Sequence, residues 1–466
     1  MTFFFFPIII LFINIKLNIS KYIIYQFQQI ENSNFSKPSE IISYLLSLEY
    51  VTNITLAEPP QIIKSYIDFT KFHFYISNVT SNREYIIEKS KSFSTIYDHD
   101  YILYTYSFLE GKYANETLYV NIKDSNISSK SNNINNDEQI IEVKNFTFSM
   151  PSKLTIKNRK MFPSSIGLGF YAYNSNHQLN FLLQLNSKNI INNTYFYIDF
   201  LDNINGNLYI GEMPHIIYPK RYKFENYEQT YTYIDNVLDE WSFRIDFIYN
   251  FAEDKNLNDT KDYIYKKNGK LVFDLNLNGI ILDMNYFQIF NKTFFDKYFK
   301  DKICKMEKIE SISYIYCNKD KVNIKKFKNI YFYQKDFNYT FTLDYNDLFY
   351  IQNNILIFNL FFDENGFSHL LNVGKIFLKK YLLVFNYDQK NIGFYKTKEE
   401  SGLKLENNKD FSNKVVKLYI IGIMVLIILG LIILFIKGFN KKTGRKIRKN
   451  ELDDDFDYTI QNNEEK

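Results

Sequence analysis

The stretch that decides the fold is residues 50–77, YVTNITLAEPPQIIKSYIDFTKFHFYIS. Its pattern predicts a strand over 51–56, a corner at Pro59-Pro60 and a second strand that ends at Asp68. Proline fixes φ and cannot donate to a strand ladder, so the double proline belongs in the corner. A carboxylate that ends an apolar strand is either a catalytic group or a turn former, because aspartate is common in turns.

A second stretch repeats this pattern about 200 positions later. Residues 270–290 read KLVFDLNLNGIILDMNYFQIF, where an apolar strand ends at Asp274 and is followed by a further apolar run and a helix-like segment. Two strand-ending aspartates at this separation indicate a chain with two related halves.

These two stretches resemble the pepsin-like aspartic protease family, whose members have two all-β lobes. The resemblance is collinear over about residues 48–397 and implies lobes at 45–215 and 216–397. Residues 20–45 read as a polar segment that leads into the first lobe. The other matching segments are SSIGLGFYAY (164–173), a hairpin with an Asn205-Gly206 turn (193–219), a helix (284–300) and NVGKIFLKKYLLVFNYDQKNIGFYK (372–396).

Residues 101–122, YILYTYSFLEGKYANETLYVNI, predict a hairpin with its turn at Glu110-Gly111. In the family, the hairpin called the flap carries a tyrosine and, seven residues later, a glycine. Tyr104 and Gly111 have that spacing, and Tyr106 gives an alternative register. The resemblance therefore implies that one of these tyrosines contacts bound substrate.

The resemblance implies catalysis by Asp68 from the first lobe and Asp274 from the second. Two carboxylates held close together share a proton, because like charges at that distance cannot both ionise. The ionised partner then takes a proton from the water that attacks the peptide carbonyl, and the neutral partner donates to the developing oxyanion.

The residues after each aspartate depart from the family, in which a Thr or Ser and then a Gly follow. Here the triplets are Asp68-Phe69-Thr70 and Asp274-Leu275-Asn276. The usual hydroxyl braces the two loops, and the glycine lets loops and water approach without a Cβ in the way. We therefore expect the carboxylates to be poorly held, and Lys71 could disturb proton sharing if its ammonium approached Asp68.

Composition excludes several other classes of protein. The 56 basic and 52 acidic residues give a net charge of +4, and the region before the predicted span lacks the basic clustering that nucleic-acid binding needs. With five His and two Cys in the chain, we expect no metal site. We also expect no cofactor, and we expect the protein to be a monomer. Cys304 and Cys317 predict one disulfide that closes a small loop, where the family's second-lobe disulfide also falls.

The two ends of the chain predict a single-pass type I membrane protein. Residues 1–19 read as a signal peptide, with an uncleaved anchor as the alternative. Residues 416–437 predict a transmembrane helix, since Leu418 to Ile436 carries no charge and lysines and arginines follow. A linker (398–415) precedes the span and a cytosolic tail (438–466) follows it. We expect the cell surface or a lysosome- or vacuole-like membrane, and N-glycosylation at some of the Asn-x-Ser/Thr sequons.

Three functions remain open from the sequence. The first is a membrane-anchored aspartic endopeptidase homologue, weak or inactive because its triplets have lost the bracing residues. The second is an inactive, membrane-tethered protein that captures a peptide or protein partner, for example as a strand added to an edge. The third is a surface coat or adhesion protein without a cleft function.

Overall fold

The structure is a computed structural model, and it describes most of residues 21–396, all within one compact unit that covers residues 1–402. The described ranges are 21–31, 35–70, 72–76, 85–104, 107–124, 139–154, 164–170, 179–232, 240–249, 263–265, 269–366 and 370–396. No helix within these ranges is long and apolar enough to cross a membrane. The predicted signal peptide, linker, span and tail lie outside the described residues.

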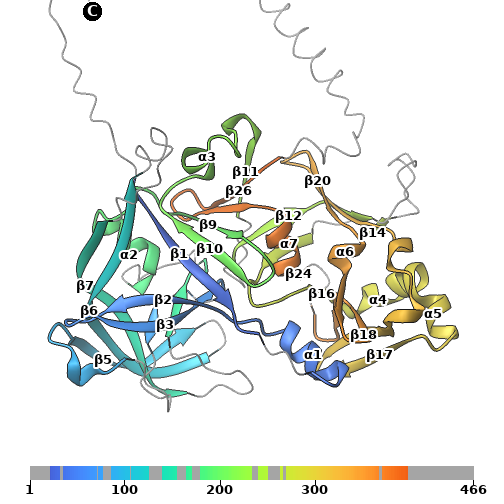
Figure 1. Ribbon diagram of the computed structural model, residues 1–466, viewed down its shortest axis with the longest axis horizontal. Helices are drawn as coiled ribbons and strands as arrows, with labels where there is room; N and C mark the ends of the chain where they lie inside the picture. Colours follow the sequence, from blue (N-terminus) through green and yellow to red (C-terminus); the bar gives the residue numbers. More distant parts are fainter. Residues whose placement is uncertain are drawn as a thin grey trace, which may run out of the picture. The chain divides into compact units, whose positions relative to one another are not determined.

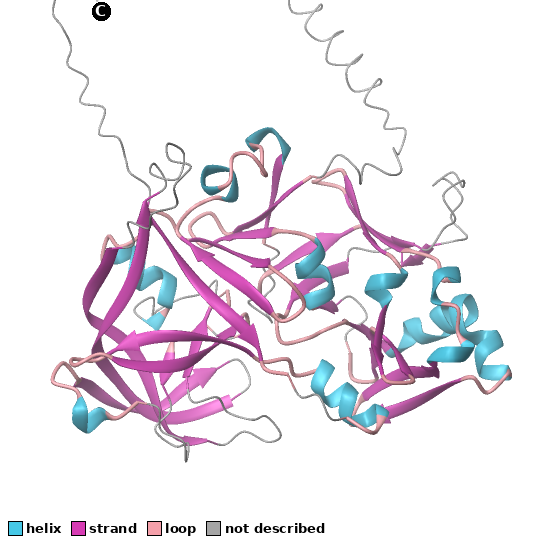
Figure 2. Cartoon of the chain, in the orientation of Figure 1, coloured by secondary structure: helices cyan, strands magenta, loops and turns pink. Residues whose placement is uncertain are grey.

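Strands dominate the described chain, as Figure 2 shows, in agreement with the predicted all-β class. The first half contains β1 (Lys21–Gln29), α1 (Pro38–Leu45), β2 (Tyr50–Leu56), β3 (Gln61–Asp68), β4 (Tyr75–Ile76), β5 (Ser94–Tyr104), β6 (Ser107–Asp124), β7 (Gln139–Leu154), β8 (Ser164–Gly167), α2 (Phe181–Ser187), β9 (Tyr195–Phe200), β10 (Asn205–Ile210), α3 (Pro214–Ile217) and β11 (Tyr227–Tyr231).

The second half begins at β12 (Ser242–Ile245) and continues to residue 396 (Figure 1). Its elements are β13 (Phe247–Tyr249), β14 (Tyr263–Tyr265), β15 (Gly269–Phe273), β16 (Ile280–Asp283), α4 (Phe287–Phe290), α5 (Asp296–Lys300), β17 (Cys304–Ile309), β18 (Ile312–Asn318), β19 (Ile330–Gln334), β20 (Tyr339–Leu343), α6 (Tyr345–Leu348), β21 (Phe349–Gln352), β22 (Ile355–Phe358), β23 (Leu360–Asp363), β24 (Leu370–Val373), α7 (Lys375–Lys380), β25 (Leu383–Asn386) and β26 (Asn391–Tyr395). The predicted helix at 284–300 is present as a nearly continuous helical run, with a π-helical segment (Asn291–Phe295) between α4 and α5.

The two halves repeat one strand arrangement around their aspartates. In the first half, β3 runs parallel to β8, β8 pairs antiparallel with β4, and β4 runs parallel to β7. In the second half, β15 runs parallel to β24, β24 pairs antiparallel with β16, and β16 runs parallel to β23. Asp68 ends β3, and Asp274 follows β15 directly. The expectation of two related halves with equivalent aspartates is therefore confirmed at the level of topology.

The strands form three sheets, and the largest contains strands from both halves. Its order is β11-β26-β25-β9-β10-β1-β2-β3-β8-β4-β7-β6-β5. The hairpin of β25 and β26, the last two strands of the described residues, joins this sheet by pairing β25 with β9 and β26 with β11. The other two sheets, of nine and four strands, contain only second-half strands.

The expected polar approach segment at 20–45 is wrong, because most of it is regular structure. β1 lies between β10 and β2, and its buried Tyr25 and Phe27 alternate with exposed Gln26 and Gln28. This period of two is a strand signal that the glutamines obscure. α1 buries Ile41, Ile42 and Leu45 in a cluster with second-half residues that include Leu277 and Phe361.

Both predicted hairpin turns are misplaced, although both hairpins exist. β5 and β6 pair as a hairpin with Tyr104 opposite Ser107, so Glu110 and Gly111 lie within β6. In the hairpin of β9 and β10 the turn precedes Asn205, and the Asp202 carboxylate caps it by accepting from the backbone N–H groups of Ile204 and Asn205.

Gly206 lies inside β10 instead of in a turn. A Cβ on this residue would lie 2.3 Å from the Phe27 ring of β1. Close packing between neighbouring strands therefore accounts for the glycine, which the sequence alone assigns to a turn.

Cys304 and Cys317 form the predicted disulfide. They are directly opposite each other in the antiparallel pair of β17 and β18. The disulfide therefore joins two strands that already form a hairpin.

Candidate functional site

Asp68 lies at the end of β3 with its carboxylate buried and bonded within its own loop. Its Oδ1 accepts from the backbone N–H of Thr70 at 2.7 Å and from the Thr70 hydroxyl at 2.6 Å. Its backbone carbonyl accepts from the N–H of Leu168, at the end of β8, at 2.8 Å. The side chain is held by Thr70 and the backbone by the parallel neighbour strand, and the residue is only 4% exposed.

Asp274 has the same local geometry in the second half. Its Oδ1 accepts from the backbone N–H of Asn276 at 2.9 Å, and its own N–H donates to the carbonyl of Val373, at the end of β24, at 3.0 Å. Asp274 is half-buried. In both halves, the aspartate is thus fixed by the N–H group two residues later and by the end of its parallel neighbour strand.

This turn geometry does not by itself identify a catalytic pair. Asp283 and Asp363 also accept from backbone N–H groups two residues later, and they do so elsewhere in the second half. Aspartate commonly closes such turns. What distinguishes Asp68 and Asp274 is the repeated topology around them and a contact that joins their loops.

Asn276 makes that contact. Its backbone N–H donates to Asp274, and its side-chain Nδ2 lies 3.5 Å from Asp68 Oδ1 as a hydrogen-bond donor. One residue of the second half therefore contacts both carboxylates. The structure brings together the two aspartates that the sequence predicted as partners, from positions 206 apart in the chain.

The family's bracing bonds are absent, as expected, but Asp68 has other hydrogen-bond partners that the expectation left out. Thr70 supplies a hydroxyl to Asp68, one residue later than the family's bracing hydroxyl, and the Asn276 carboxamide links the two loops. Thr70 and Asn276, which replace the third-position glycines, both carry side-chain donors, and this is the signal in the sequence from which these bonds could be predicted.

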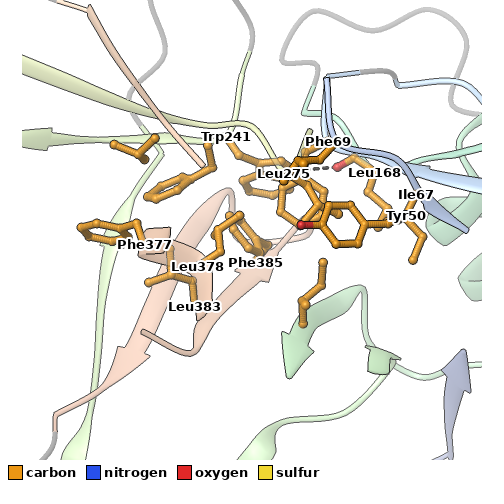
Figure 3. Close-up of a cluster of buried hydrophobic side chains, with 14 of the residues drawn as sticks. Tyr50, Ile67, Phe69, Leu168, Trp241, Leu275, Phe377, Leu378, Leu383 and Phe385 are labelled. Atoms are coloured by element: carbon orange, nitrogen blue, oxygen red, sulfur yellow. Dashed lines mark hydrogen bonds between the residues drawn. The ribbon is translucent and has the colours of Figure 1, made fainter. Parts of the chain in front are cut away.

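Phe69 and Leu275, at the family's hydroxyl positions, lie in the hydrophobic core. Phe69 packs edge-to-face on Phe196 and Phe385, with ring centroids 5.5 and 5.2 Å apart, and is 2% exposed. Leu275 is fully buried in the same cluster, which Figure 3 shows with both side chains. Phe69 therefore packs into the core and does not separate the carboxylates. Lys71 lies outside the described residues.

Trp241 joins the halves beneath the aspartates. Its indole Nε1 donates to the carbonyl of Leu168 at 2.7 Å, and its ring packs on Phe385 at 5.3 Å (Figure 3). Leu168 is the residue whose N–H bonds to Asp68. We call the cluster of Phe69, Leu168, Trp241, Leu275 and Phe385 the seam, since it contains residues of both halves.

The loop after Asp274 is held by close backbone contacts on two sides. From the N-terminal side, the N–H of Leu48 donates to the carbonyl of Asn276 at 2.6 Å. From α7, the N–H of Lys375 donates to the carbonyl of Leu277 at 2.7 Å. A Cβ on Gly374 would lie 1.9 Å from that same carbonyl oxygen, so only glycine permits this approach.

A buried lysine lies where the N-terminal strand meets this region. The Lys375 ammonium donates to the side chain of Gln29, in β1, and to the carbonyl of Asn203. Burial, with a smaller contribution from the Lys379 ammonium, lowers the pKa of Lys375 to about 8. Lys375 also lies 5.9 Å above the ring of Tyr50, whose pKa burial raises well above its ordinary value with smaller contributions from Tyr44 and Asp274.

The predicted flap residues cannot be placed against the aspartates. Tyr104 is the last residue of β5, with its side chain outside the described part, and Tyr106 lies outside the described residues altogether. Across the described ranges, no group of three or more His, Cys, Asp or Glu could hold a metal ion.

Comparison with known proteins supports the architecture. Protein-family models and the sequences of curated proteins give no match. Among solved structures, basic 7S globulin from soybean is similar with a TM-score of 0.57 and 12% identity, over 83% of this chain and 98% of the globulin. Conglutin gamma, a basic 7S globulin from lupine seeds, is similar with a TM-score of 0.57 and 13% identity, over 81% of this chain and 95% of conglutin gamma.

An aspartic proteinase from Irpex lacteus is also similar, with a TM-score of 0.52 and 13% identity over 82% of this chain and 98% of the proteinase. At this identity the likeness concerns the fold alone. The fold occurs in a proteinase and in proteins described as seed globulins, so it does not decide between cleavage and other functions. The chain has the mostly β, bilobal fold of the pepsin-like proteins, and its function has to be argued from its site.

Proposed function

We propose that the protein is a membrane-anchored aspartic endopeptidase homologue that binds peptide segments at Asp68 and Asp274 and cleaves them weakly. The observation that carries the proposal is the position of Asn276, which contacts both carboxylates. Proton sharing requires two carboxylates close together, and the contact of one residue with both acids supports that arrangement.

The chemistry follows from the two carboxylates alone. As a water oxygen bonds to the peptide carbonyl carbon, the ionised carboxylate takes a proton from the water and the neutral carboxyl gives its proton to the carbonyl oxygen. When the carbon–nitrogen bond breaks, the first group returns its proton to the leaving amine and the second recovers one from the hydroxyl. No metal or cofactor is needed for these steps.

The activity is weak in this proposal because the surroundings of the acids differ from those in the family. Phe69 and Leu275 are committed to the core and offer no hydroxyl to the opposite loop. Catalytic groups need their geometry held to about 0.5 Å, which such supporting bonds provide. Thr70 and Asn276 supply bonds of another geometry.

The second candidate is a protein with the same peptide-binding site and no cleavage. The contact between Asn276 and Asp68 favours it, because an amide placed between two carboxylates occupies space that the reaction uses. Membrane anchoring through residues 416–437, with the two halves outside the cytosol, belongs to both candidates. It is supported by the uncharged run from Leu418 to Ile436 and by the lysines and arginines that follow.

The test uses the full chain in detergent or vesicles with an unfolded protein substrate and pepstatin as inhibitor. We expect slow cleavage at acid pH that pepstatin blocks and that Asp68→Asn and Asp274→Asn each abolish. Pepstatin binding without cleavage in the wild type would select the second candidate. Cleavage that survives both substitutions, or a complete lack of pepstatin binding, would refute both candidates.

Membrane anchoring has its own measurement. The full chain should remain with membranes in alkaline carbonate, and a chain ending at residue 415 should be released. Release of the full chain by carbonate would contradict the predicted span.

A further inference from the structure

We propose that Asn276 is the residue that limits cleavage at this site, and that its replacement by glycine raises the peptidase rate. The inference rests on the proposed function and adds a named cause for the weak activity. Asn276 occupies the third position of the Asp274 triplet, where the family has glycine. It is also the residue that contacts both carboxylates.

The Asn276 side chain takes up space beside the two carboxylates. Asn276 bonds to Asp274 through its own backbone N–H and reaches Asp68 with the end of its side chain. A side chain that starts beside one carboxylate and ends beside the other lies between them or along their edge. Glycine at this position would leave that volume to the water and to the scissile peptide.

Oδ1 of Asp68 already accepts from the N–H and the hydroxyl of Thr70, and the Asn276 amide is a third donor on the same oxygen. The two Thr70 donors already match the two lone pairs of this oxygen, so the Asn276 amide is a surplus donor at 3.5 Å. Asn276→Gly removes this contact and keeps the two Thr70 bonds that hold the carboxylate.

A carboxamide neither gives up nor takes a proton at the pH values where carboxylates titrate. An Asn276 amide bonded to Asp68 therefore fills a position from which it cannot assist proton transfer.

The substitution is compatible with the local backbone. Asn276 is not among the residues with positive φ, and its carbonyl keeps its bond from Leu48 whatever side chain it carries. Asn276→Gly also keeps the backbone N–H that bonds to Asp274. The substitution thus removes the contact with Asp68 and leaves the other bonds of the loop in place.

The experiment compares wild type, Asn276→Gly and the control Asn353→Gly in the full chain. Asn353 has a φ of 53° in the exposed turn between β21 and β22, which glycine adopts readily. We expect Asn276→Gly to raise kcat at least tenfold with a smaller change in KM. Asn353→Gly should leave both unchanged.

Asp68→Asn in the Asn276→Gly background must abolish the gained activity, which assigns it to this site. Pepstatin affinity and the urea unfolding curve, read by the fluorescence of Trp241, show that each variant is folded and binds. If Asn276→Gly is folded and binds pepstatin but its kcat stays at or below that of the wild type, this inference is wrong and the proposed function stands. If no variant binds pepstatin, the proposed function itself fails.

If Asn276→Gly is too unstable to assay, Asn276→Ser tests the same point. Its side chain is shorter than that of asparagine, and serine loses less backbone freedom on folding than glycine does. It should give an intermediate gain in kcat, since serine cannot span from the loop to Asp68 as asparagine does. A serine variant with unchanged kcat and normal folding would count against the inference in the same way.

Discussion

Trp241 donates its indole N–H to the carbonyl oxygen of Leu168 over 2.7 Å, and both residues are buried. Leu168 donates its own N–H to the carbonyl of Asp68. The start of the second half is therefore tied, through one buried residue, to the loop that carries the aspartate of the first half. The seam and the candidate site are parts of one connected structure.

The substitution Trp241→Phe should lower the free energy of unfolding by about 2–3 kcal/mol, because the Leu168 carbonyl loses its indole donor and the smaller ring leaves a cavity. Urea unfolding followed by circular dichroism measures this. Tyr231→Phe, at a residue that is 79% exposed, is the control and should change stability by less than about 0.5 kcal/mol. An equal effect of both substitutions would show that the indole bond adds nothing.

Trp241 is the only tryptophan in the chain, so its fluorescence reports on the seam alone. In the native protein the fully buried indole should emit at short wavelength, and the emission should shift to the red as the seam opens. If the halves unfold together, this shift and the loss of far-ultraviolet circular dichroism coincide in urea. A red shift that precedes the loss of strand signal would mean that the halves separate before they unfold.

Restoring the family's hydroxyl at Phe69 should harm the protein. Phe69 packs on Phe196 and Phe385 in the core, so Phe69→Thr leaves a cavity and buries a hydroxyl, and we expect a loss of about 3–5 kcal/mol. Thermal and urea unfolding measure the loss. The matched control is Phe224→Thr, at a residue that is 71% exposed, which should be nearly neutral. A stable, more active Phe69→Thr would mean that the core can close around threonine.

The sequence predicted the arrangement of the fold well because the signals for it are local. Strand-ending Asp68 and Asp274, the disulfide of Cys304 with Cys317, and the helix at 284–300 each depend on nearby residues or on simple spacing. The resemblance to one family then placed these features in order.

What could not be predicted depends on residues far apart in the chain. Gly206 looked like a turn glycine, and only the Phe27 ring of a distant strand explains it. Phe69 looked like a lost hydroxyl, and its partners Phe196 and Phe385 show why an aromatic ring suits the position. Asn276 looked like a lost glycine, because no local pattern reveals a side chain that reaches a residue 208 positions away.

Lys375 should make stability depend on pH in the alkaline range. Burial first, and then Lys379, lower the pKa of Lys375 from 10.5 to about 8, so the unfolded chain binds more protons between these two values. The free energy of unfolding therefore rises with pH across this window, by about 3 kcal/mol for the full shift. Below pH 8 the cost of burying the charged amine is present in full, and above 10.5 it has gone.

The measurement is the difference in unfolding free energy between Lys375→Met and wild type at pH 7 to 9.5. Many tyrosines titrate above that range, so the comparison stays below it. The variant should lack the rise with pH that Lys375 contributes. Lys297→Met, at an exposed position on α5, should retain the wild-type slope. Parallel curves for wild type and Lys375→Met would mean that the ammonium is solvated.

Exposure separates the sequons that can carry a glycan in the folded protein, given the secretory location proposed above. Asn53 and Asn145 are exposed, and Asn145 has a φ of 54°. Asn115 is half-buried, and its Oδ1 accepts from the Thr147 hydroxyl at 2.8 Å. Asn291 has a buried side-chain oxygen within the helical run. A glycan needs the asparagine side chain in solvent, so we expect occupancy at Asn53 and Asn145 and none at Asn115 or Asn291.

The protein is purified from the membranes of a eukaryotic host and deglycosylated enzymatically in ¹⁸O-labelled water. Peptide mapping then detects each occupied site as a mass increase on the former asparagine. Asn53→Gln and Asn145→Gln should each remove one glycan and leave the urea midpoint unchanged. Glycans are added before folding finishes. A glycan on Asn115 would then prevent the hydrogen bond between Asn115 and Thr147 and disturb the pairing of β6 with β7. Finding a glycan there on folded protein would contradict the structure around Asn115, and finding none at any of the four sites would contradict the secretory location.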